Sequence, residues 1–146
     1  MGAYADAVVA IRSRLDTEWA ALHASVPVYY DNQAANADRL DPSTDSAWLL
    51  AEIRAGAERT SEFGGGVGAN RWRKTGEVLI RVFVPVNTDR AVSDGLVDDV
   101  STIFRGWQNG DLKFFAVSDA AGGQSQEFGN WFERAVIASF TFDLTG

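Results

Sequence analysis

Apolar side chains recur at helical spacing at the start of the chain. They follow one another at steps of three and four, which places them on one face of an α-helix. Charged residues fall between them, and Val26-Pro27 ends the pattern. The pattern predicts a helix over residues 3–23, with an apolar stripe made of Tyr4, Val8, Ile11, Leu15, Trp19 and Leu22.

The middle of the chain changes to strand-like patterns. Val26–Tyr30 is short, β-branched and aromatic, and the polar stretch 31–46 that follows predicts a loop. Trp48–Arg54 alternates in part and continues toward Phe63, while Arg71–Pro85 is the longest β-rich segment. Because a run of glycines separates these two segments, they predict a long hairpin with a flexible, glycine-rich tip.

A second helix and two strands complete the pattern. Asn87-Thr88-Asp89 supplies N-cap chemistry, and apolar residues then recur at helical spacing over 89–107. Strands over 112–118 and 131–144 follow, separated by a loop rich in Gly, Ser and Gln. We therefore expect an α+β fold in which two helices pack on one face of an antiparallel-rich sheet. The stripe of the second helix comprises Val92, Leu96, Val100, Ile103 and Trp107.

Length, cysteine content and charge narrow the class of protein. A chain of 146 residues is expected to form a single domain, 1–146, with its own core. The absence of cysteine excludes disulfides, thiolate zinc sites and a cysteine nucleophile. A net charge of −7 disfavours ordinary nucleic-acid binding, because that binding rests on basic residues. The apolar stretches are too short for a signal peptide or a membrane span, so we expect neither.

For each residue that could serve catalysis or metal binding, the sequence favours a structural or surface role. His23 is the only histidine, and its place at a helix end favours a capping or surface role. The glycine run 64–68 lacks the Gly-Lys-Ser/Thr ending of a phosphate loop and precedes a strand. Asp98 and Asp99 are adjacent on the second helix, so we expect them to face solvent. Asp38, Asp41 and Asp45 lack the ligand pattern of a calcium-binding loop. Glu127 and Glu133 could suggest the carboxylate pair of a glycoside hydrolase, but the sequence does not fix their separation.

Aromatic and arginine side chains near the hairpin tip form a candidate interaction surface. Trp72 lies between Arg71 and Arg73 and belongs to no clear buried face, whereas Trp19 and Trp107 lie on helical stripes and are expected in the core. Tryptophan and arginine are enriched at protein interfaces. Packing of Trp72 on its own domain is an equal alternative. The candidate subunit or tail interface comprises Phe63, Gly64, Gly65, Gly66, Arg71, Trp72 and Arg73.

The segment from Phe63-Gly64 through Asn70–Pro85, followed by a helix ending in Ile103-Phe104, resembles the small tail-terminator-like proteins of long-tailed bacteriophages and gene transfer agents. The resemblance extends over most of the chain. It includes the first helix, the short strand before a variable loop, and the closing strand with its tryptophan and phenylalanines.

This resemblance implies a virion protein that forms a homo-oligomeric ring, expected to be a hexamer, at the head-proximal end of the tail after assembly in the host cytoplasm. It implies contact with the tail-tube protein and the head-tail connector or stopper, no enzyme activity and no cofactor. DNA would only pass through the ring, and an acidic lumen would let it slide without adhering. Two alternatives stay open: another neck or tail-tube subunit, and a small glycan- or protein-binding module that uses Trp72 and Trp131 as stacking platforms.

Overall fold

The computed structural model describes residues 4–31, 47–62, 65–86, 89–124 and 131–145. These residues form two helices and six strands. The strands make one mixed sheet in the order β1-β2-β3-β6-β5-β4, and the helices form a layer against it. The β1-β2 pair is parallel and all other pairs are antiparallel. In chain order the elements are α1 (Tyr4–Leu22), β1 (Val28–Tyr30), β2 (Trp48–Glu62), β3 (Arg71–Pro85), α2 (Arg90–Phe104), β4 (Gln108–Asn109), β5 (Leu112–Gln124) and β6 (Trp131–Thr145).

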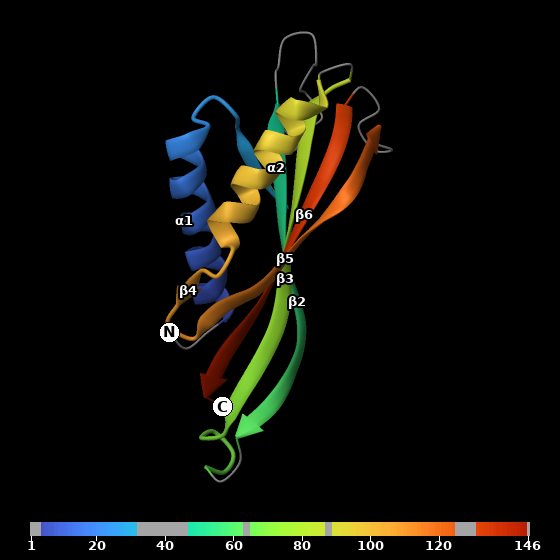
Figure 1. The fold of residues 1–146 in the computed structure, drawn as a ribbon. Coiled ribbons are helices and arrows are strands. Elements are labelled where there is room, and N and C mark those ends of the chain that lie inside the picture. The colour runs from blue at the N-terminus through green and yellow to red at the C-terminus, as the bar shows by residue number, and fades with distance from the viewer. Residues whose placement is uncertain (1–3, 32–46, 63–64, 87–88, 125–130, 146) are drawn as a thin grey trace.

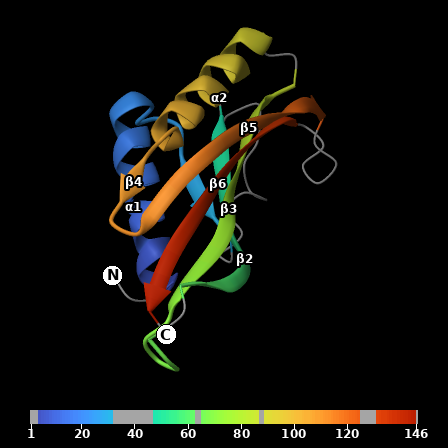
Figure 2. The same ribbon diagram turned by 60° about the horizontal axis from the view of Figure 1, so that its bottom comes forward.

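Both helices lie on the same face of a strongly twisted sheet (Figures 1 and 2). The predicted α+β class, with an antiparallel-rich sheet and two helices on one face, is therefore confirmed. The main core fills the space between the layers, where buried side chains of α1 and α2 meet Val78, Ile80, Phe140 and Phe142. Neither helix combines the length and apolar character needed to cross a membrane.

The helices form close to where the patterns predicted them, with corrections at their ends. Asp89 caps α2, because its side chain accepts a hydrogen bond of 2.9 Å from the Ala91 amide. Gly106, at φ +70°, ends the helix, so Trp107 lies beyond it and is only half-buried. The expected stripes are also wrong at two positions, since Leu22 is 54% exposed and Val92 47% exposed.

The central hairpin matches its predicted strands closely. β2 and β3 pair from Trp48 with Phe83 to Glu62 with Arg71. Two predictions at the other edge of the sheet need correction. β5 is longer than 112–118, because its pairing with β6 continues to Gln124 opposite Phe132, and the two-residue strand β4 was not predicted.

A second apolar cluster lies on the sheet face away from the helices. Side chains alternate along a strand, so Trp48 and Phe83 point opposite to their core-facing neighbours Leu49 and Val82. The Trp48 and Phe83 rings stack with centroids 4.0 Å apart, and Trp131 meets Trp48 edge-on at 5.8 Å. The sheet therefore buries aromatic side chains on both of its faces.

Candidate interaction surface on the long hairpin

The tip of the hairpin is a tight turn beyond both helices (Figure 1). Gly66 and Gly68 have φ of +77° and +88°, a backbone region that glycine enters without steric cost. Gly65 and Gly66 are exposed, whereas Phe63 and Gly64 lie outside the described residues. The part of the predicted interface that is described therefore stands at the end of a projecting arm.

Arg71 and Arg73 point to the sheet face away from the helices, where both meet one carboxylate. Arg73 donates from Nε to Asp143 Oδ1 at 2.8 Å and from Nη2 to Oδ2 at 3.1 Å. Arg71 donates from Nη2 to the same Oδ2 at 3.1 Å and lies 3.4 Å from Asp111 Oδ1. The shared partner of both arginines is therefore a carboxylate of the chain itself, on β6.

The Asp143 side chain is only 6% exposed, while the two guanidinium groups remain about half-exposed. The hydrogen bond from Arg73 is the main reason that the pKa of Asp143 is lowered, and burial acts against it. The same hydrogen bonds raise the pKa of Arg71 and of Arg73. The end of the sheet near the hairpin tip thus carries a charged cluster, in which the nearly buried carboxylate of Asp143 holds Arg71 and Arg73.

Trp72 does not share a face with its two arginine neighbours. It lies opposite Leu144 on β6 and is half-buried, on the side of the sheet that carries the helices. Trp131, the other suggested stacking platform, is 3% exposed and packs in the second aromatic cluster. The structure therefore does not bring these two rings together on an open surface.

Arg59 is a member of this surface that sequence reasoning missed. It lies directly opposite Arg73 in the β2-β3 ladder. A cavity of about 420 Å³ runs beside the pair, lined by Ala57, Arg59, Thr60, Arg73 and Thr75. The bulge between Ala55 and Glu58 sets this pairing, and no local pattern in the sequence reveals where such a bulge falls.

The described histidine and acidic residues that were candidates for catalysis or metal binding mostly make structural contacts. His23 Nε2 lies 2.5 Å from Asp99 Oδ2, so Asp99 joins α2 to the residue that follows α1 while its side chain stays 39% exposed, and Asp98 is exposed as expected. Glu133 pairs with Arg81 at 2.9 Å. Asp38, Asp41, Asp45 and Glu127 lie outside the described residues. Within the described residues, no three His, Asp or Glu side chains gather as metal ligands would.

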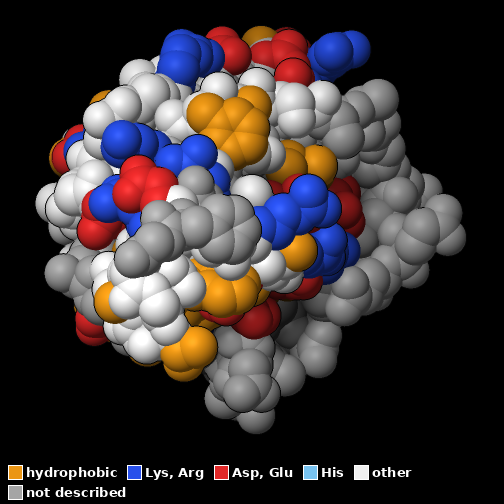
Figure 3. Space-filling model, turned by 90° about the horizontal axis from the view of Figure 1, so that it is seen from below, with side chains coloured by type: hydrophobic (Ala, Val, Ile, Leu, Met, Phe, Trp, Pro, Cys, Tyr) orange, Lys and Arg blue, Asp and Glu red, His pale blue; other side chains and the backbone are white. Residues whose placement is uncertain are grey.

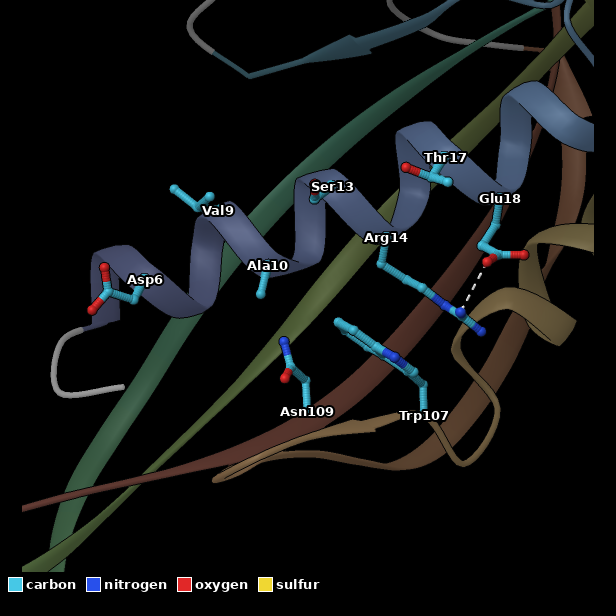
Figure 4. A pocket seen from close by; sticks show the side chains of 9 residues that line it. All are labelled: Asp6, Val9, Ala10, Ser13, Arg14, Thr17, Glu18, Trp107 and Asn109. Carbon is cyan, nitrogen blue, oxygen red and sulfur yellow. Dashed lines mark hydrogen bonds and ion pairs between the residues drawn. The ribbon is translucent and has the colours of Figure 1, made fainter.

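A pocket of about 590 Å³ lies beside α1, and Arg14 forms part of its lining (Figure 4). Arg14 donates from Nε and Nη2 to the Ile103 carbonyl at 3.2 and 3.1 Å, and from Nη1 to Glu18 at 3.0 Å. Its guanidinium also lies 5.4 Å from the centre of the Trp107 ring. These contacts tie α1 to the end of α2 and use one donor on each of the three guanidinium nitrogens, so Arg14 has a structural role.

Seen from below, the hairpin end shows basic, acidic and apolar side chains side by side (Figure 3). This mixture differs from the continuous basic stripe that binds nucleic-acid backbones.

Comparison with known proteins supports the fold alone. No family model matches the chain, and no curated protein matches it. One solved structure, whose name describes no function, is similar with a TM-score of 0.61 and 17% sequence identity. The similarity covers 99% of this chain and 98% of that chain. The whole chain thus shares its arrangement with a protein of distant sequence.

Proposed function

We propose that this protein is a structural subunit of a long-tailed phage or gene transfer agent, a tail terminator that assembles as a homo-hexameric ring. In this role it ends tail-tube growth at the head-proximal end in the virion and offers a docking surface for the head-tail connector. DNA passes through the ring without specific binding. The role requires no catalytic group and no cofactor.

The observation that carries the proposal is the projecting hairpin. Its arms continue past the helical layer, and residues 54–59 of β2 are exposed (Figure 1). Among the described residues, β1 covers the outer edge of β2 only over Leu49–Ala51. Beyond Ala51 the outer edge of β2 has no strand partner among the described residues, so a second chain is a natural source of contacts for it.

The edge of β2 is also protected against indiscriminate pairing. Charged side chains and two irregularities in register, between Ala55 and Glu58 and between Thr60 and Glu62, interrupt the flat edge that strand addition needs. A contact of this arm would therefore run through side chains. A contact between this arm and a different surface of the next copy would generate a ring where the rotation between copies closes, and an open filament where it does not.

Sedimentation and negative-stain microscopy of the purified chain test the ring. We expect a closed particle of about 95 kDa, six times the 15.8 kDa chain. A 15.8 kDa monomer at every concentration would contradict the proposal.

Incubation with growing tail tubes tests the terminator role. We expect the rings to sit at one end of each tube and to stop its growth. Open-ended polymers of the chain itself would instead assign it as a tail-tube subunit.

A further inference from the structure

Two arginines lie directly opposite each other in the ladder of the hairpin. Arg59 on β2 lies directly opposite Arg73 on β3, and like charges in such a position destabilise a sheet. Arg73 shares Asp143 with Arg71. Arg59 is exposed and makes no hydrogen bond or ion pair with the described residues. Arg59 is therefore an exposed guanidinium that has no ionic partner among the described residues and lies beside a second guanidinium.

The surroundings of the pair suit an anion. The cavity of about 420 Å³ beside the arginines is also lined by Thr60 and Thr75, whose hydroxyl groups can donate hydrogen bonds. Arg73 uses Nε and Nη2 for Asp143, which leaves its Nη1 without a partner among the described residues. A planar anion could thus receive charge-assisted hydrogen bonds from both arginines.

We infer that Arg59 and Arg73 form a docking site for a carboxylate of a second copy of this chain. The inference rests on the proposed ring and names one contact between its subunits. The chain's own composition favours this occupant, since it carries 20 Asp and Glu against 13 Lys and Arg. Helix surfaces of a neighbouring copy offer carboxylates that are exposed and make no ion pair with the described residues, among them Asp6 and Asp98.

A phosphate of DNA is the other anion that such a site would accept. The net charge of −7 repels a polyanion at long range, and the basic groups near the site alternate with Glu58, Glu62 and Asp111. A single carboxylate that arrives on a complementary protein surface meets no such barrier.

The variant Arg59→Glu separates a docking role from a structural one. It places a carboxylate opposite Arg73, so we expect the monomer to melt at the same or a higher temperature than the wild type. We expect its ring to form at least about tenfold more weakly, because the site then repels an incoming carboxylate. Arg59→Lys keeps the charge and should assemble nearly as the wild type does.

Arg105→Glu is the matched control, because Arg105 is also exposed and makes no ion pair with the described residues. It changes the net charge equally and should leave assembly unchanged. Sedimentation of all four proteins, with melting measured at dilutions where they are monomeric, gives both quantities. Equal weakening by Arg105→Glu would indicate general repulsion and overturn the site.

The remaining outcomes separate this contact from the proposed ring. A wild-type ring that Arg59→Glu leaves intact overturns the contact alone, whereas a wild-type chain that never assembles overturns the ring and the contact together. A gel-shift measurement with a short DNA duplex tests whether the site binds a DNA phosphate instead. Binding by the wild type that Arg59→Glu abolishes would assign the site to phosphate and overturn the carboxylate.

Discussion

At the scale of single residues, one carboxylate organises the lower end of the sheet. Asp143 lies on the last strand, seventy and seventy-two positions away from the two arginines that it holds. Its side chain is nearly buried, so loss of its charge removes the one carboxylate that both guanidinium groups share and leaves Arg71 with Asp111 as an ion-pair partner. The stability of this region is therefore tied to the protonation of one group.

The lowered pKa of Asp143 makes stability depend on pH. Because its pKa in the folded chain lies below the ordinary value of 3.8, the folded state holds its proton less tightly than the unfolded state does. Its contribution is present above that value and is lost as the pH falls through the lowered pKa. We expect Asp143→Asn to lower the free energy of unfolding by about 1–2 kcal/mol at pH 7. Urea denaturation at a series of pH values should also show a smaller loss of stability at acid pH in the variant than in the wild type. An equal loss in both proteins would contradict the ion pairs.

The tryptophans that sequence patterning placed together in the core differ in burial. Trp19 is 1% exposed, and its Nε1 donates a hydrogen bond of 3.1 Å to the Val26 carbonyl. We expect Trp19→Ala to cost about 3–5 kcal/mol. Trp107 is half-buried, so Trp107→Ala should cost about 1–2 kcal/mol. Urea denaturation of both variants gives the two values, and equal losses would contradict the difference in burial.

At the scale of elements, close packing of strands on one another decides what each position tolerates. β3 is the central partner of β2 and β6, and it pairs with β6 over its whole length. Gly76 marks a point of close approach, because a Cβ there would lie 2.6 Å from the Arg54 carbonyl oxygen and from the Phe140 ring. Gly95 in α2 has no such neighbour within 4 Å.

These two glycines predict opposite effects of the same substitution. Gly76→Ala forces the Phe140 ring or the strand to shift, so we expect it to destabilise by about 1–3 kcal/mol. Gly95→Ala adds a better helix former in open space and should stabilise by about 0.5–1 kcal/mol. Thermal unfolding measures both, and stabilisation by Gly76→Ala would show that β3 and β6 are not packed so closely.

At the scale of the whole molecule, the helical layer covers one side of the sheet and the hairpin tip reaches beyond it (Figure 2). The two helices and the sheet share one core, whereas residues 65–69 are exposed and lie outside it. Segments with few buried contacts open locally at low free-energy cost. The tip is therefore where assembly should change protection most.

Hydrogen exchange of the free and assembled protein measures this change. We expect amides in 65–72 to exchange rapidly in the monomer and more slowly in the ring, because a neighbouring chain would then shield them. Amides of β3 over 78–83, which lie in the sheet between β2 and β6, serve as the internal control. Equal protection of the tip in both states would contradict its role in assembly.

The sequence by itself determined which segments are helices and which are long strands, because the periods of the apolar pattern are local properties. The hairpin arms and the α+β class follow from such periods, and the N-cap lies within the triplet Asn87-Thr88-Asp89, whose polar side chains suit that position. Only the tertiary structure decided that Arg71 and Arg73 share Asp143 and that Arg59 faces Arg73. These meetings depend on strand register and a bulge, which contacts between distant segments set.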